Sequence, residues 1–142
     1  MLLLLTAAVL LEPKVDYPAI RQRLLRGNYG EARSGYEVLL KDEKPAAAAF
    51  VGLARVHRET GEYAKAAEAL DAGLKSHPGD PTLLAHRADL AFSQGKWDDA
   101  TSDAEASIKK DEQNFLARWV RVRLLRDKGD VAAAEKEVRW FV

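Results

Sequence analysis

The sequence predicts an all-α protein that is built as a solenoid of antiparallel helix pairs. Three observations favour this fold class: a spacing of 34 residues recurs through the chain, apolar residues lie at helical intervals, and alanine is abundant while aromatic residues are few. A fixed period of roughly 20 to 50 residues is typical of repeat architectures. In such proteins each unit buries its apolar side by stacking on the next. The length of 142 residues therefore predicts one domain of about four units.

The period is carried by a glycine and by two columns of residues that follow it. The glycines that stand 34 residues apart are Gly27, Gly61, Gly95 and Gly129. Two positions later come Tyr29, Tyr63, Trp97 and Val131, and five positions later come Ala32, Ala66, Ala100 and Ala134. The alanine column has a physical cause, because two helices that approach closely leave room only for a small side chain. Each glycine is predicted to turn the chain between the two helices of a unit.

The first predicted unit covers residues 13–46 and contains two helical stretches. Asp16 is predicted to cap a first helix that ends near Arg26. A second helix is expected over about residues 29–41, and the polar linker 42–45 ends the unit.

The second predicted unit, residues 47–80, shows the helical pattern most clearly. Its first helix is expected over about residues 47–60. The apolar stripe of its second helix, at the spacing of one helical face, is Tyr63, Ala66, Ala67, Leu70 and Leu74. Pro78 and Gly79 end this helix, because proline cannot continue a helix and glycine tolerates the turn.

The last two predicted units cover residues 81–114 and 115–142. Pro81 opens the third unit, since proline suits the first turn of a helix. The residues expected to face inward are Trp97, Ala100, Ala104 and Ile108 in the third unit, and Val122, Leu125, Val131, Ala134 and Val138 in the fourth.

Residues 1–12 form an apolar N-terminal segment with two open interpretations. The run 2–11 carries no charge, but it is too short for a membrane-spanning helix, which needs roughly 20 apolar residues. It resembles the apolar centre of a secretory signal, although it lacks a basic start and a clear small-residue cleavage site. It is either a remnant of a signal or anchor or a short first helix. The compartment, cytoplasmic or exported, is therefore left open.

The period of 34, with Gly, then Tyr or Trp, then Ala, and with Pro before the next unit, resembles the tetratricopeptide repeat. The resemblance covers residues 13–142. The second unit fits best, through Leu53, Ala54, Gly61, Tyr63, Ala66, Leu70, Leu74 and Pro78. Units one and three have Lys44 and Glu112 where the family has proline. The resemblance implies a right-handed superhelical binding scaffold whose first helices line a concave groove, and it does not identify a partner.

Carrying the groove positions of the family onto this chain gives a candidate peptide-binding site. Its residues are Tyr17, Arg21, Arg55, Arg58, His86, Asp89, Phe92, Trp119, Arg123 and Arg126. Arginine suits carboxylates because its planar guanidinium gives two parallel hydrogen bonds, and Phe92 and Trp119 could supply apolar anchors.

The arginines have a biased distribution that allows two interpretations. Those on predicted first helices are Arg21, Arg23, Arg26, Arg55, Arg58, Arg87, Arg118, Arg121, Arg123 and Arg126, whereas many acids lie on second helices. They could form a groove for an extended or helical peptide with acidic character. Alternatively, they solvate the surface and pair with neighbouring helices, as exposed charges commonly do.

No catalytic, cofactor or metal site is predicted, so the chain is expected not to be an enzyme. His57, His77 and His86 lack the spacing of three or four residues that places two metal ligands on one helix face. There is neither a glycine-rich phosphate loop nor a nucleophile elbow. A net charge of zero argues against nucleic acid as the partner.

The C-terminal end predicts an uncovered apolar surface. The chain ends in Trp140, Phe141 and Val142, and no polar capping helix follows them. We expect that the natural chain continues past Val142, or that this end associates with another copy. The main functional hypothesis is a protein-binding scaffold, and the alternative is an assembly segment of a larger protein with a downstream enzyme domain.

Overall fold

The computed structural model describes residues 16–142, so both interpretations of residues 1–12 lie outside the described part of the chain. Residues 16–142 form eight α-helices and no strand, which confirms the predicted all-α class. The helices are α1 (Tyr17–Leu25), α2 (Tyr29–Leu39), α3 (Ala47–Glu59), α4 (Tyr63–Ser76), α5 (Pro81–Ser93), α6 (Trp97–Lys110), α7 (Phe115–Asp127) and α8 (Val131–Val138). A short 3₁₀-helix, η1 (Arg139–Phe141), ends the chain.

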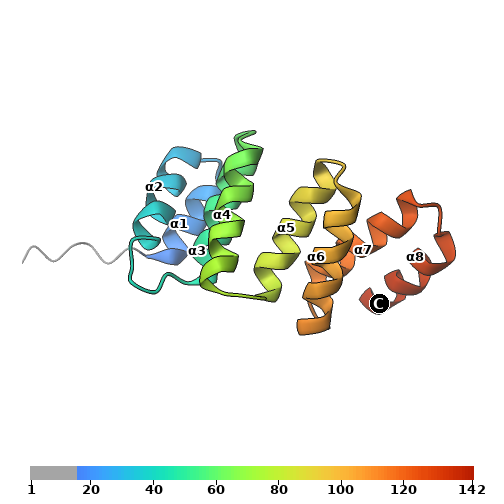
Figure 1. The fold of residues 1–142 in the computed structure, drawn as a ribbon. Helices are drawn as coiled ribbons and strands as arrows, with labels where there is room; N and C mark the ends of the chain where they lie inside the picture. Colours follow the sequence, from blue (N-terminus) through green and yellow to red (C-terminus); the bar gives the residue numbers. More distant parts are fainter. Residues whose placement is uncertain (1–15) are drawn as a thin grey trace, which may run out of the picture.

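The helices form four successive pairs, and each pair packs on the next (Figure 1). Helices α1, α3, α5 and α7 are the first helices of the pairs, and α2, α4, α6 and α8 are the second helices. The contacts between α3 and α5, and between α5 and α7, place successive first helices next to one another. The two ends of the described chain therefore lie at opposite ends of a helical solenoid.

The four glycines of the 34-residue period all have positive φ, between 72° and 80°. This left-handed conformation is strained for residues that carry a Cβ, so glycine is the residue that fits. At the second turn the Gly61 amide donates to the Arg58 carbonyl at 3.0 Å, and the Glu62 amide donates to the His57 carbonyl at 2.7 Å. The other three turns repeat this pair of bonds, which satisfies carbonyls left free at the helix ends.

Three helix starts are capped by a side-chain hydrogen bond, whereas the predicted cap, Asp16, is an N-cap by its position alone. Asp80, Asn114 and Asp130 accept hydrogen bonds from the amides three residues on, at 2.9, 3.0 and 3.1 Å. Asp16 occupies the N-cap position of α1, but its side chain accepts no such bond. At that start Pro18 takes up one of the first-turn positions, and it has no amide hydrogen to donate.

The core is a row of clusters between helix pairs, centred on small residues. Ala32, Ala66 and Ala100 are at most 1% exposed, as the alanine column predicts. Four residues predicted to face inward are exposed instead: Tyr63 (46%), Trp97 (46%), Val131 (67%) and Val138 (41%). The first three lie at the start of a second helix, beside the turn, where no neighbouring helix covers them. Val138 lies on the last helix pair of the described chain, where no helix among residues 16–142 covers it.

No helix in the described part of the chain combines the length and the apolar character needed to cross a membrane.

Candidate functional site

The ten candidate residues lie on one stripe of each first helix, and we call this stripe the first-helix face. Within each helix their spacing is three or four residues, which places them on the same side. Tyr17 on α1 lies close to α3, with its hydroxyl 3.5 Å from the Ala48 carbonyl oxygen. Because α3, α5 and α7 pack side by side, the stripes form a continuous surface.

Asp89 on α5 is the residue that joins three first helices. Its carboxylate accepts a hydrogen bond from Arg58 of α3 at 2.6 Å and another from Arg123 of α7. The Asp89 side chain is only 16% exposed. One carboxylate therefore neutralises part of the charge of two arginines and fixes the positions of both.

Arg123 is also held against an aromatic pair. Its guanidinium carbon lies 4.3 Å from the centre of the Phe92 ring, a cation–π contact. Phe92 in turn packs edge-to-face against Trp97, with ring centres 5.1 Å apart. The Nε atom of Arg123 is buried and has no hydrogen-bond partner among residues 16–142. Trp97 was not a predicted site residue, although its place five residues after Phe92, just beyond a glycine turn, could have indicated the contact.

His86 and Arg55 lie beside this group, over the small side chains of α3 and α4. Burial and, to a smaller extent, the positive charge of Arg55 lower the pKa of His86 to about 4, against the opposing effect of Asp89. His86 is therefore neutral near pH 7. The depression between Arg55, Arg58 and His86 has a volume of about 10 Å³, which is room for about one water molecule.

At the α1 end of the face, Tyr17 packs edge-to-face on Tyr36 of α2, with ring centres 6.0 Å apart. Burial raises the pKa of Tyr36, and so does Tyr17, whereas Arg55 and Arg21 act in the opposite direction. Tyr36 is 1% exposed and fills the space left by the missing side chain of Gly52. The structure thus brings Tyr17, Arg21 and Arg55 into one neighbourhood.

Trp119 and Arg126 make their contacts with residues outside the group around Asp89. Trp119 packs on Phe141 of η1 with ring centres 6.3 Å apart, and Phe141 also packs on Phe115 at 4.8 Å. Arg126 pairs with its neighbour Asp127 at 3.0 Å, and both side chains are exposed. The structure places these two residues on α7 toward the C-terminal end.

Seven of the ten first-helix arginines form ion pairs, which supports the interpretation that arginines pair with neighbouring helices. The pairs of Arg87 with Asp103 and of Arg121 with Glu137 repeat at a distance of 34 residues. Burial opposes ionisation of Glu137, but hydrogen bonds from Arg121 and Arg118 outweigh it and lower its pKa. Within residues 16–142 the first-helix arginines without an acidic partner are Arg21, Arg26 and Arg55.

The larger clefts lie between second helices, away from the candidate residues. One of about 400 Å³ is lined by residues of α4, α5 and α6, including Asp71, Arg87 and Asp103. Another of about 440 Å³ lies one unit earlier and is lined at equivalent positions, including Glu37 and Leu53. Both are open, and ion pairs occupy the walls of the first. No group of His, Asp and Glu side chains in residues 16–142 is placed to hold a metal ion.

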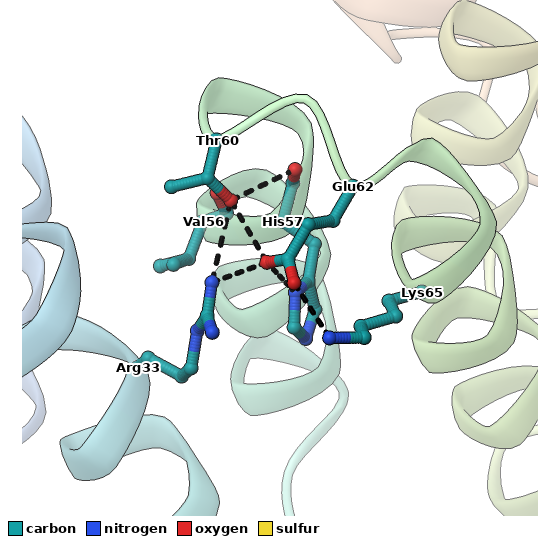
Figure 2. Close-up of polar contacts among 6 residues, drawn as sticks. All are labelled: Arg33, Val56, His57, Thr60, Glu62 and Lys65. Atoms are coloured by element: carbon teal, nitrogen blue, oxygen red, sulfur yellow. Dashed lines mark hydrogen bonds and ion pairs between the residues drawn. The ribbon is translucent and has the colours of Figure 1, made fainter.

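Figure 2 shows a polar cluster that sequence reasoning did not find, in which several side chains surround the Glu62 carboxylate. Lys65 donates to it at 2.6 Å, His57 Nδ1 lies at 2.9 Å, Thr60 Oγ1 lies at 3.0 Å, and Arg33 of α2 pairs with it. The hydrogen bonds from Lys65, His57 and Thr60 lower the pKa of Glu62 to about 2. The cluster joins α2, α3 and α4 at one turn. The equivalent residues one unit later, among them Ala67 and Ala91, cannot form it.

The geometry defines a helical-repeat protein with a charged and aromatic surface on its first helices. The sequence pattern described as "Tetratricopeptide repeat" matches residues 20–81 and 87–139. The chain belongs to the tetratricopeptide repeat family.

Solved structures with the same fold include two of PcrH. PcrH from Pseudomonas aeruginosa superimposes with a TM-score of 0.64 at 18% identity, over 84% of this chain and 88% of PcrH. PcrH in complex with the chaperone binding region of PopB gives a TM-score of 0.59 at 19% identity, over 85% of this chain and 90% of that one. A search of curated proteins gave no match.

Proposed function

We propose that this chain is a non-enzymatic scaffold that binds a segment of a partner protein along its first-helix face, and that acidic residues of the partner contribute to binding. The observation that carries the proposal is the continuous stripe of ten residues, which contains five arginines and one aspartate. Arg55 in the middle of the stripe has no acidic partner in the described chain. An acidic side chain of a partner would complete its interactions.

The shape of the face supports a chain-like ligand. The depression there, about 10 Å³, is far below the roughly 300 Å³ at which pockets for small molecules begin. A segment that lies across several helices could contact many of the stripe residues at once. The complex of PcrH with the chaperone binding region of PopB is consistent with a protein segment as the ligand of this fold. The alternative, an assembly segment that serves a downstream enzyme, is not favoured.

The test is selection of peptides from a random display library on the purified chain, followed by affinity measurement. We expect the charge reversals Arg55→Glu and Arg123→Glu to weaken the selected peptides at least about tenfold, which corresponds to about 1.4 kcal/mol. Lys109→Glu, on the exposed C-terminal turn of α6, is the control with the same charge change. Binding that is equally strong in all variants would contradict the proposal.

We also propose that the C-terminal end of the solenoid associates with a second copy. Tyr36, Leu70 and Ala104 stand at the position of Val138 in the earlier units and are at most 2% exposed, whereas Val138 is 41% exposed. The helix that follows each of the first three pairs covers this position, and exposed apolar surface of this kind favours association. Light scattering over a range of concentrations tests this. We expect a dimer that Val138→Lys dissociates, and a monomer throughout would contradict it.

A further inference from the structure

Some arginines of the first-helix face are paired with acidic residues, and others are not. Arg21 and Arg55 occupy equivalent positions in consecutive units and form no ion pair with residues 16–142. The next residue at this position is Asp89, followed by Arg123, and these two pair with each other. Arg58 lies at the boundary, since it also pairs with Asp89. Free positive charge is therefore concentrated on α1 and α3.

Exposed aromatic rings are more numerous in the last two helix pairs, where Trp97, Phe115 and Trp119 are exposed, whereas Tyr63 is the exposed ring of the first two pairs among residues 16–142. Trp97 is 46% exposed and packs on Phe92, and Trp119 is 44% exposed on α7. Trp119 and Arg123 are four residues apart on one side of α7, and Arg123 covers the Phe92 ring, so Arg123 connects the side of α7 that carries Trp119 to Phe92 of α5. At the α1 end, by contrast, Tyr36 is buried.

We propose that the first-helix face has two halves that recognise different parts of one ligand. The acid-binding half consists of Arg21 on α1 and Arg55 on α3, and Arg58, which pairs with Asp89 and Glu59, marks its border. The apolar half consists of Phe92 on α5 and Trp119 on α7, together with Trp97 of α6, which packs on Phe92 beside the face. The partner is a protein segment with acidic residues at one end and aromatic or large aliphatic residues at the other. This inference rests on the proposed function, and it adds the composition and direction of the ligand.

The arrangement also sets a length. Neighbouring packed helices lie about 10 Å apart, so the two halves are separated by about two helix steps, or about 20 Å. An extended chain advances about 3.3 Å per residue. The acidic and apolar residues of an extended ligand would therefore be separated by about six residues.

The test is a set of double-mutant cycles between the chain and peptides selected from a random display library. In one peptide the acids are replaced by Asn or Gln, and in another the aromatic or aliphatic residues are replaced by Ala. The protein variants are Arg21→Gln with Arg55→Gln for the acid-binding half, and Trp97→Ala with Trp119→Ala for the apolar half. Fluorescence anisotropy gives the affinities, and circular dichroism checks that each variant is folded.

We expect acid removal to weaken binding about tenfold on the unchanged chain and less than about twofold on the Arg21→Gln, Arg55→Gln variant. Replacing the aromatic or aliphatic residues of the peptide by Ala should likewise weaken binding about tenfold on the unchanged chain and less than about twofold on the Trp97→Ala, Trp119→Ala variant. Matched controls are Arg23→Gln, since Arg23 of α1 is paired with Glu31 of α2, and Tyr63→Ala, since Tyr63 shares the repeat position and the 46% exposure of Trp97. Neither control substitution should change the loss of affinity that the peptide replacements cause.

Three results would overturn the inference in distinguishable ways. Selected peptides that bind through the first-helix face, but whose acids show no coupling to Arg21 and Arg55, would remove the division into halves and leave the scaffold function intact. If no substitution on the first helices changes peptide binding, both the division into halves and the proposed binding along this face are wrong. A random oligonucleotide that binds more tightly than any selected peptide, through Arg21 and Arg55, would assign the basic half to nucleic acid instead.

Discussion

At the scale of single residues, the packing of Tyr36 depends on a glycine. A Cβ built on Gly52 would lie 2.1 Å from Cε1 of Tyr36 and 2.2 Å from its Cζ, and Tyr36 cannot move outward because it is 1% exposed. We expect Gly52→Ala to lower the free energy of unfolding by about 1 to 3 kcal/mol, the usual effect of overpacking a core. Denaturant unfolding followed by circular dichroism measures this.

Gly30 provides the matched control within α2. A Cβ there meets no atom within 4 Å, and its φ is ordinary. Gly30→Ala should therefore leave stability unchanged or raise it by up to about 1 kcal/mol, because alanine favours the helix. Equal effects of the two substitutions would show that helix propensity, and not the fit of Tyr36, governs both sites.

His86 makes stability depend on pH. Its ordinary pKa of 6.5 falls to about 4 in the folded chain, where burial and the arginines of α3, Arg55 and Arg58, disfavour the charged form while Asp89 favours it. The unfolded state therefore binds more protons between pH 4 and 6.5, and stability rises with pH across this window. We expect a loss of about 2 kcal/mol from His86 alone on going from pH 7.5 to pH 5.

Unfolding of His86→Gln at the two pH values isolates this contribution, because glutamine does not titrate. Glu62 does not interfere, since its pKa change from 4.5 to about 2 acts at lower pH. If the variant loses as much stability as the unchanged chain between pH 7.5 and pH 5, another group is responsible.

At the scale of helices, Asp89 connects α3, α5 and α7. Without its carboxylate, Arg58 and Arg123 would face each other as like charges, and Arg123 would keep only its contact with Phe92. We expect Asp89→Ala to cost about 1 to 3 kcal/mol of unfolding free energy, the range for hydrogen bonds to charged groups. Urea unfolding measures this.

Asp127→Ala is the control for this prediction. It removes a carboxylate that pairs with Arg126 within α7, where both side chains are exposed. Exposed pairs contribute little, so the expected change is below about 0.5 kcal/mol. Similar effects at Asp89 and Asp127 would mean that the bridge between helices adds no stability.

The helices could be predicted from the sequence because their ends are fixed by local chemistry. A glycine with positive φ closes each first helix, and Pro81 opens α5, so these boundaries need no knowledge of distant residues. The ion pairs could not be predicted in the same way. Asp89 reaches Arg58 and Arg123, which are 31 and 34 residues away, and such contacts depend on how neighbouring units are rotated.

The cluster around Glu62 is another set of contacts between units that could not be predicted from the sequence. His57, Thr60 and Lys65 lie within five residues of Glu62, but the contact with Arg33 requires the first unit to pack in register with the second. The sequence contains no repeat of this set, so periodicity gave no signal. The exposure of Val138 likewise follows from its place in the last pair, because its equivalents in earlier pairs are buried.

At the scale of the whole molecule, stability should vary along the solenoid. The described contacts run between neighbouring units, so α3 to α6 are covered on both sides, whereas α1, α2, α7 and α8 are covered on one. In repeat proteins stability is approximately a sum of unit and interface terms, so end units open more often. We expect amide hydrogen exchange to be slowest in α3 to α6.

The C-terminal pair provides the sharper part of this prediction. Helix α8 has one buried residue, Ala134, and its end is held by the contact of Phe141 with Phe115. Mass spectrometry of exchanged peptides should therefore show α8 exchanging faster than α6, and Phe141→Ala should speed exchange in α8 while leaving α4 unchanged. Acceleration of α4 to the same extent would mean that the units unfold as one cooperative block. Dimerisation through the C-terminal end would slow exchange in α8 as protein concentration rises, because the second copy would cover Val138.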